Sequence, residues 1–226
     1  MRNRKMKIEK NDRTRSKALD FLTGPAEIEK RSFEIISEQL AGCAIDPENE
    51  NVIKRVIHTT ADFDYAQNLI FSDNAVTKAK SLLKQGARIV TDTQMVKAGV
   101  SKKVAARLGC GLYCFIDSLE VIEAANVNGF TRARAAVDHA VKTLKNPLIF
   151  VIGNAPTALI RLYELVEAGV FIPEFIIAVP VGFVNVVESK ELILGSDAPH
   201  IVARGRKGGS NVAAAICNAL LYDIER

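Results

Sequence analysis

Five short, mostly apolar runs between residues 88 and 205 constrain the fold more than any other feature of the chain. They read RIVTDT (88–93), GLYCFI (111–116), PLIFVIG (147–153), EFIIAVP (174–180) and HIVARG (200–205). Their apolar stretches show no regular polar alternation, which is typical of strands buried on both faces of a parallel sheet. Helical patterns separate the runs. This order predicts one α/β domain with three αβα layers and a mostly parallel sheet of about five strands.

Helices are predicted before the first strand and between the strands. Pro25 suits the first turn of a helix, Asp46 suits the N-cap of a helix that continues through Pro47 to His58, and Asn74 suits the N-cap of a third. The three N-terminal helices are expected in residues 24–42, 46–58 and 74–86. The later helices are expected in residues 94–109, 131–145, 154–169, 185–195 and 208–225.

Charge separates a short N-terminal arm from the rest of the chain. Residues 1–17 contain eight Lys or Arg against Glu9 and Asp12, a net charge of +6, whereas the whole chain carries +4. Residues 1–22 are therefore predicted to be a basic, disordered arm, and residues 23–226 a single domain. The rest of the chain is slightly acidic and shows no basic recognition helix, so no nucleic-acid partner is expected.

Apolar patterning and cysteine spacing narrow the class of protein further. No run approaches the roughly 20 apolar residues of a membrane span, and the N-terminus lacks the apolar stretch of a signal peptide. We therefore expect a cytoplasmic protein that does not bind a membrane. The four cysteines show neither CxxC pairs nor zinc-type spacing, so we expect buried reduced thiols and no metal site. They are Cys43, Cys110, Cys114 and Cys217.

Function is expected in the turns that follow the strands, because open α/β sheets bind ligands outside the carboxyl ends of their strands. These turns are polar, and they read TDTQM (91–95), GNAPT (153–157), PVGFVN (180–185) and RGRKGGS (204–210). The last of them places three cations and three glycines directly before a helix. That combination favours binding of carboxylates or phosphates, and a flexible solvated loop is the alternative.

The GNAPT turn places Gly153 at a strand end, where the first amides of the next helix face outward. It is either an anion-binding end, with Asn154 or Thr157 as cap, or an ordinary turn with Pro156 in the first helical turn. The lysine of a P-loop is missing, and so is a GxGxxG motif with its acidic partner. No nucleotide cofactor is therefore expected.

Two further turns allow both a binding and a structural interpretation. Asp92 either bonds a ligand or caps a helix, and Thr91 lies beside it. Backbone amides at Gly182 and Phe183 could approach a flat ligand. The alternative is a plain turn followed by a surface ion pair between Glu188 and Lys190.

The helix in residues 131–145 begins with two arginines. Thr131 is its expected cap, and Arg132 and Arg134 in the first turn oppose the helix dipole, a conflict that a bound anion would relieve. Solvation of both arginines is the alternative. His139 is expected at the surface and His200 in a structural role.

His58 ends the predicted second helix, within RVIHTTADFDY (55–65). A histidine at this position is favoured by the helix dipole and often does nothing more. A histidine side chain, whose ordinary pKa is about 6.5, nevertheless suits proton transfer at neutral pH.

Together these segments resemble the precorrin-8X/cobalt-precorrin-8 methylmutase family of corrin biosynthesis, in motif order and spacing. The resemblance covers nearly all of the chain after the basic arm. It rests on RSFEII (31–36), RVIHTTADFDY (55–65), TDTQMVKAG (91–99), TRARAAVD (131–138), VIGNAPTALIRLYEL (151–165), VPVGFVNVVESKEL (179–192) and VARGRKGGSNVAAAICNAL (202–220).

The resemblance implies a homodimeric isomerase that moves a methyl group from C-11 to C-12 of a tetrapyrrole substrate, giving hydrogenobyrinate or cobyrinate. It implies no cofactor, and His58 of the IHT motif as the proton donor of an acid-assisted 1,5-sigmatropic shift. Cations and backbone amides would hold the carboxylates of the macrocycle. The implied substrate-binding residues are Ser32, Thr59, Thr91, Asp92, Thr131, Arg132, Gly153, Asn154, Thr157, Val181, Gly182, Phe183, Arg204, Arg206, Gly208, Gly209 and Ser210.

Roles for the neighbours of His58 are also expected. Thr59 and Thr60 would orient His58 or touch the ring, and Asp62 and Asp64 would cap the next helix. Two other classes stay open, a non-catalytic tetrapyrrole carrier and a nucleotide- or nucleic-acid-binding module. The sequence favours the cobalt-containing substrate only weakly.

Overall fold

The computed structural model describes residues 22–225, so the predicted basic arm lies outside the described residues except for Leu22. The strands are β1 (Leu69–Phe71), β2 (Arg88–Thr91), β3 (Leu112–Tyr113), β4 (Leu148–Ile152), β5 (Phe175–Ala178) and β6 (His200–Ala203). The helices are α1 (Pro25–Leu40), α2 (Glu50–Thr60), α3 (Tyr65–Asn68), α4 (Ala75–Lys84), α5 (Gln94–Gly99), α6 (Lys102–Arg107), α7 (Leu119–Asn128), α8 (Arg132–Thr143), α9 (Pro156–Glu167), α10 (Val186–Leu194) and α11 (Ser210–Glu225).

The sheet contains six described strands in the order β1-β6-β5-β4-β2-β3. The five predicted strands are all present and run parallel to their neighbours, and β1 adds a sixth, antiparallel to β6, at one edge. The expected number of about five therefore omitted β1, whose three residues are too short a run to stand out. GLYCFI forms only two residues of strand at the opposite edge.

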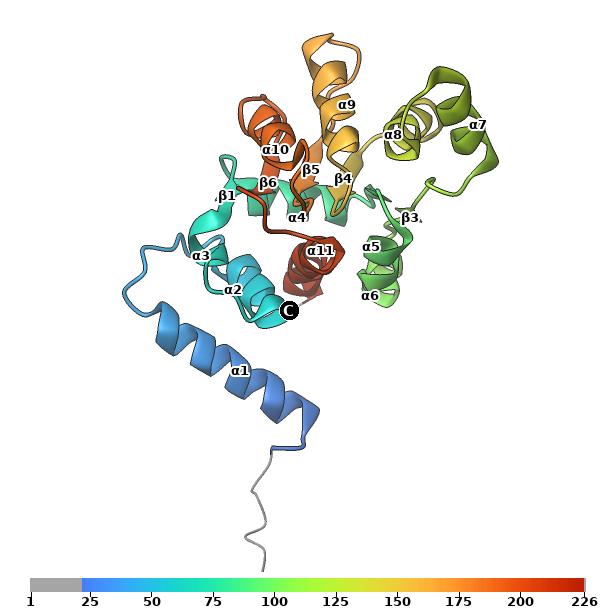
Figure 1. Cartoon of the computed structure of the whole chain (residues 1–226). Coiled ribbons are helices and arrows are strands. Elements are labelled where there is room, and N and C mark those ends of the chain that lie inside the picture. Colours follow the sequence, from blue (N-terminus) through green and yellow to red (C-terminus); the bar gives the residue numbers. More distant parts are fainter. Residues whose placement is uncertain (1–21, 226) are drawn as a thin grey trace, which may run out of the picture.

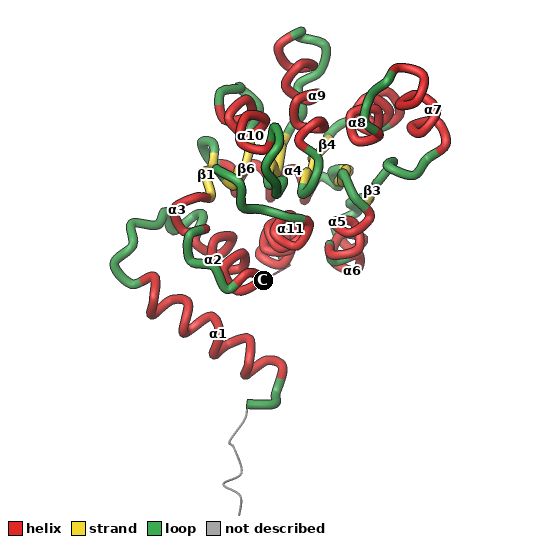
Figure 2. Tube along the Cα trace, in the orientation of Figure 1, coloured by secondary structure: helices red, strands yellow, loops and turns green. Residues whose placement is uncertain are grey.

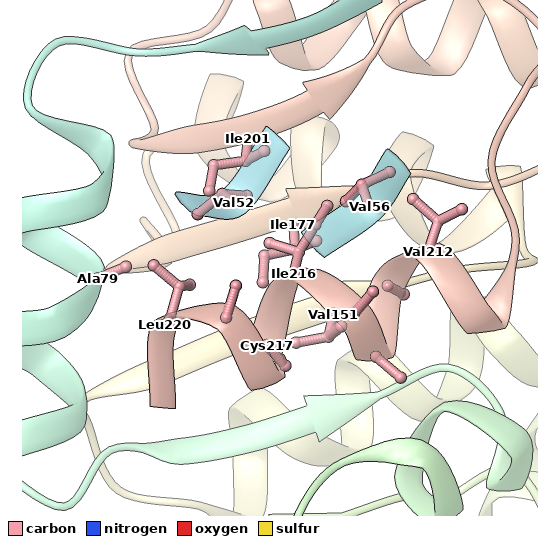
Figure 3. Packing of buried hydrophobic residues seen from close by; sticks show 14 of the residues in the cluster. Val52, Val56, Ala79, Val151, Ile177, Ile201, Val212, Ile216, Cys217 and Leu220 are labelled. Atoms are coloured by element: carbon pink, nitrogen blue, oxygen red, sulfur yellow. The ribbon is translucent and has the colours of Figure 1, made fainter. Parts of the chain in front are cut away.

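Each face of the sheet is covered by its own layer of helices, which confirms the three-layer architecture (Figure 1). On one face Val151, Ile177 and Ile201 pack against α2, α4 and α11, and Figure 3 shows Ile216 of α11 beside Ile177. On the other face Phe150 and the alternate residues of the neighbouring strands pack against α8, α9 and α10. Because both faces are buried, the strands need apolar residues at every position.

Helix α1 lies on the outer side of α2, away from the sheet (Figures 1 and 2). It begins at Pro25, as predicted. Only Ile36 and Leu40 of this helix are buried, and Ile28 and Ile35 remain exposed. The body of the domain therefore leaves part of the apolar surface of α1 uncovered.

Several predicted helix boundaries were wrong. Helix α2 begins at Glu50, because the Asp46 carboxylate accepts the amide of Glu48 and closes a turn around Pro47. The long run 94–109 divides into α5 and α6, with the amide of Ser101 donating to the side chain of Asn218 between them. Asn74 does occupy the N-cap of α4, in a left-handed conformation without a capping side-chain bond.

Some expectations about burial were also wrong. Cys110 and Cys217 are buried, whereas Cys43 is exposed and Cys114 is half-buried. His139 is half-buried, with its ring 4.7 Å from that of Phe115.

His200 is buried, and its Nδ1 lies 2.8 Å from the carbonyl oxygen of Ala198. Burial lowers the pKa of His200, which favours its neutral form. That environment supports the structural role expected for it.

Phe150 belongs to the core between the sheet and helices α8, α9 and α10, so its truncation tests the layered packing. Its side chain is fully buried on the central strand β4. Phe150→Ala should lower the free energy of unfolding by about 3–5 kcal/mol in urea denaturation, because the cavity left behind cannot collapse. The exposed Val170→Ala is the control and should change it by less than about 0.5 kcal/mol. Equal effects of the two substitutions would contradict this packing.

Candidate functional site

The polar turns predicted to carry function gather at the carboxyl edge of the parallel strands. The hydroxyl groups of Thr93 and Ser210 lie 3.2 Å apart and join the turn after β2 to the start of α11. The amide of Gly182 donates to the carbonyl of Arg206 at 3.2 Å, which joins the turn after β5 to the loop after β6. The structure thus brings together segments that lie more than 100 residues apart in the sequence.

Asp92 occupies the point at which the strand order reverses, between β2 and β4. Its carboxylate accepts the backbone N–H groups of Gly153, Asn154 and Ala155 at 3.0, 2.7 and 2.7 Å. Burial raises the pKa of this carboxyl group, and the three amide bonds oppose that rise. The backbone amides of the turn after β4, which were expected to bind an anion, therefore have Asp92 as their hydrogen-bond partner.

Asp92 does not cap α5, the helix that follows β2. The helix cap at this turn is the neighbouring Thr93, whose hydroxyl accepts the amide of Val96 at 3.2 Å. Thr91 is buried, and its hydroxyl lies 3.1 Å from the carbonyl of Tyr113, which it bonds as part of the fold. The turn after β2 is thus an internal support for the turn after β4.

The loop in residues 204–209, between β6 and α11, carries the three predicted cations. Arg204 pairs with both carboxylate oxygens of Glu191, at 3.0 and 3.2 Å. Lys207 pairs with Asp62 and Asp64, with its Nζ 2.6 Å from an oxygen of each. The Arg206 guanidinium lies 5.8 Å from the centre of the Phe183 ring. Fixed partners therefore hold two of the three cations.

The loop backbone at Gly208 lies too close to its neighbours for any residue with a side chain. A Cβ at Gly208 would lie 2.2 Å from the carbonyl oxygen of Val179, so any side chain there would collide with backbone. The amide of Gly209 donates to the same carbonyl at 2.8 Å and is therefore already satisfied. The loop packs directly on the end of β5, which a freely solvated loop would not do.

Lys190 is a loop contact that the sequence did not reveal. The predicted surface ion pair between Glu188 and Lys190 was wrong, because Lys190 is fully buried. Its Nζ donates to the carbonyl groups of Gly205 and Lys207, each at 2.8 Å. Its position in the helical pattern was visible in the sequence, but its partners depend on the tertiary fold.

His58 lies exposed in the last turn of α2, with its ring 5.3 Å from that of Phe33 on α1. Phe33 also lines an open groove of about 660 Å³ between α1 and α2. Ser32, the other predicted residue of α1, is half-buried beside Phe33. The ring of His58 therefore lies at the surface, stacked on a side chain that lines this groove.

The two threonines and two aspartates that follow His58 bond the backbone of α2 and the side chain of Lys207. Thr59 and Thr60 donate their hydroxyl groups to the backbone carbonyls one turn earlier in α2, and neither orients His58 through such a bond. Asp64 stands at the N-cap of α3 without a capping side-chain bond, and both aspartates bind Lys207 instead. Lys207 lowers the pKa of Asp62 accordingly.

The start of α8 forms a neighbouring part of the same edge. Thr131 caps α8 as predicted, accepting the amide of Arg134 at 3.2 Å. Its hydroxyl also lies 2.7 Å from that of Thr157 at the start of α9. Arg132 pairs loosely with Asp117 at 3.5 Å.

Exposed apolar side chains lie beside these cations. Val181, Phe183 and Val184 follow β5, and the side chain of Phe183 is 82% exposed. An apolar surface next to arginines suits a ligand with a flat apolar body and an anionic rim.

Within residues 22–225, no group of three or more His, Cys, Asp or Glu side chains gathers closely enough to hold a metal ion. No helix in the same range is long and apolar enough to cross a membrane.

The fold and the site define a mostly parallel α/β protein whose carboxyl edge presents arginines and apolar side chains, and whose helix α2 exposes a histidine in its last turn. Comparison with known proteins gives the family. The family model for precorrin-8X methylmutase (CbiC) matches residues 27–223, and the chain belongs to that family of isomerases, which shift a methyl group within one molecule. The family predicted from the sequence motifs is thereby confirmed.

Individual relatives cover almost the full chain. The cobalt-precorrin-8 methylmutase of Salmonella typhimurium is 44% identical over 213 residues, covering 91% of this chain and 99% of that protein. The precorrin-8X methylmutase of Pseudomonas aeruginosa is 35% identical over 211 residues, covering 92% and 100%. The crystal structure of precorrin-8X methylmutase from Thermus thermophilus has a TM-score of 0.81 at 34% identity, covering 88% and 97%.

Asp92→Asn tests the support of the turn after β4. The amide NH₂ group cannot accept a hydrogen bond, so at least one buried N–H of residues 153–155 loses its partner. The free energy of unfolding should fall by about 1–3 kcal/mol in urea denaturation. The exposed Asp197→Asn provides the same chemical change without burial and should stay within about 0.5 kcal/mol of the parent. Equal stability of the two variants would refute the role of Asp92.

Proposed function

We propose that this chain moves the methyl group from C-11 to C-12 of cobalt-precorrin-8 or precorrin-8X, giving cobyrinate or hydrogenobyrinate in cobalamin biosynthesis. One observation of the structure carries the proposal beyond family membership. Lys207 joins the loop 204–209 to the segment that follows His58 through Asp62 and Asp64. The loop that carries the arginines is therefore bonded to the segment that follows the proposed acid, which supports a shared site.

The substrate would lie against the exposed apolar residues with its carboxylates facing the cations. Phe183 supplies an exposed ring for the flat macrocycle, and Arg206 stands above that ring. Arg204 and Arg132 are held by exposed carboxylates, and such surface pairs contribute little, at most about 1 kcal/mol, so substrate carboxylates can replace these partners. The charge-assisted bonds that result fix the orientation of the macrocycle.

The proposed binding residues divide into two groups by their contacts. One group would meet the substrate: Ser32, Thr59, Thr131, Arg132, Thr157, Val181, Gly182, Phe183, Arg204, Arg206, Gly208 and Ser210. The other group shapes the site from below through the contacts described above: Thr91, Asp92, Gly153, Asn154 and Gly209.

His58 would act as the general acid. It donates a proton to the macrocycle, which draws electrons toward the protonated atom and weakens the bond to the migrating methyl group. The methyl group shifts along the conjugated system, and loss of a proton from the macrocycle then gives a product isomeric with the substrate. No electrons enter or leave, and this scheme requires no cofactor.

We also propose that the chain forms a homodimer and works in the cytoplasm. The uncovered apolar residues of α1, Ile28 and Ile35, support a partner subunit at this helix. A dimer of this kind would cover apolar surface that the isolated chain leaves in water.

His58→Ala tests the proposed acid. Loss of general acid catalysis should lower kcat by about 10²- to 10⁴-fold, while the dissociation constant for substrate stays within about threefold of the parent. Turnover is followed by the visible spectrum of the rearranged chromophore, with cobalt-containing and metal-free substrates measured in parallel.

His139→Ala is the matched control for this experiment, because it removes an imidazole outside the site, and it should keep parental turnover. Parental turnover by His58→Ala would remove His58 from the mechanism. A parent protein that binds both substrates without changing the chromophore would be a carrier.

Deletion of residues 1–17 tests the basic arm and the dimer together. The family relation and the described site begin after this segment, so kcat and KM should remain within about twofold of the parent. Light scattering should give twice the monomer mass for both chains. A large loss of activity or a monomeric truncated chain would show that the arm contributes to the site or the dimer.

A further inference from the structure

Lys190 is a buried cation with no carboxylate partner among the ion pairs of residues 22–225. It lies on α10 with its side chain fully buried, and its Nζ reaches the loop 204–209, where it donates to two carbonyl groups at 2.8 Å. Its neighbour Glu191 is engaged by Arg204. Two neutral carbonyl dipoles are thus the direct hydrogen-bond partners of the ammonium group.

Burial of a charged group costs free energy unless hydrogen bonds or an opposite charge compensate for the lost water. Burial lowers the pKa of Lys190 to about 8, so its ammonium form is much less favoured here than in water. An apolar residue of similar length would fill the same space in α10 without that cost. The side chain is therefore better explained by its two bonds to the loop than by packing.

The two bonds from Lys190 fix the backbone of the loop at Gly205 and Lys207. The carbonyl groups of Gly205 and Lys207 point toward α10, where Lys190 holds them. The carbonyl between them, of Arg206, accepts the amide of Gly182 in the turn after β5. Three consecutive carbonyls are thus held from two directions.

The side chain of Lys207 connects the loop to the segment that follows α2. While Lys190 holds the carbonyl group of Lys207, the ammonium group of Lys207 bonds Asp62 and Asp64, just after His58 in the chain. A continuous path of direct contacts therefore runs from α10, through the loop with the arginines, to the end of α2.

We propose that Lys190 is a positioning residue for the methyl shift, which holds the loop 204–209 so that its arginines stay in place to bind the carboxylates of the substrate. This role rests on the proposed function. Lys190 is buried beneath the loop and does not touch the substrate. It acts on binding, because α2 itself is held by its packing on α11 and keeps His58 in place without the loop.

Lys190→Met tests this role, because the thioether chain fills the space and donates no hydrogen bond. With cobalt-precorrin-8 as substrate, KM should rise about tenfold or more, while kcat stays within about threefold of the parent. Hydrogen exchange at the backbone amides of residues 204–209 should become faster, while α10 and α11 keep their protection. Lys190→Gln, which can still donate to one carbonyl, should fall between the parent and Lys190→Met and serves as the test variant if Lys190→Met does not fold.

Ser189→Ala is the matched control. Ser189 is equally buried and adjacent on α10, but its hydroxyl bonds only the carbonyl of Val186 within the helix, so KM and loop exchange should match the parent. A Lys190 variant with lower thermal stability but parental KM and loop exchange would overturn the positioning role. Failure of the parent protein to rearrange the substrate would instead overturn the proposed function.

Discussion

The carboxylate of Asp92 holds three backbone amides of the turn after β4, and the rest of the carboxyl edge is built on that contact. It keeps Gly153 close to α11, where a Cβ on Gly153 would lie 2.9 Å from the Cα of Ser210. The start of α11 in turn ends the loop 204–209, whose Lys207 reaches Asp62 and Asp64. The turn that Asp92 holds thus packs against the start of α11, next to the loop that carries the outer, charged parts of the site.

The fold was largely predictable because its signals are local. Buried parallel strands need continuous apolar residues, and the runs around Ile149 and Ile176 meet that need over a few residues. Elements that depend on distant partners were missed. Strand β1 has three residues and forms through pairing with β6, and α7 exposes Leu119 and Val127, which blurs its helical pattern.

The meeting of the polar turns was also predictable, since turns at the carboxyl ends of parallel strands must meet at one edge. The partners of their side chains were not predictable. Asp92 and Lys207 were expected to be available to a ligand, and Lys190 was expected in a surface ion pair. Which amide, carbonyl or carboxylate each one meets is decided by contacts across 15 to 145 residues of sequence.

The edge strand β1 has a consequence for the segment between α2 and the sheet. Its pairing with β6 and the bond from the amide of Arg204 to the carbonyl of Asn68 attach that segment beside the start of the loop 204–209. Residues 61–68 are thus fixed at both ends and work as a spacer of set length. Asp62 and Asp64, which lie within this spacer, are thereby kept within reach of Lys207.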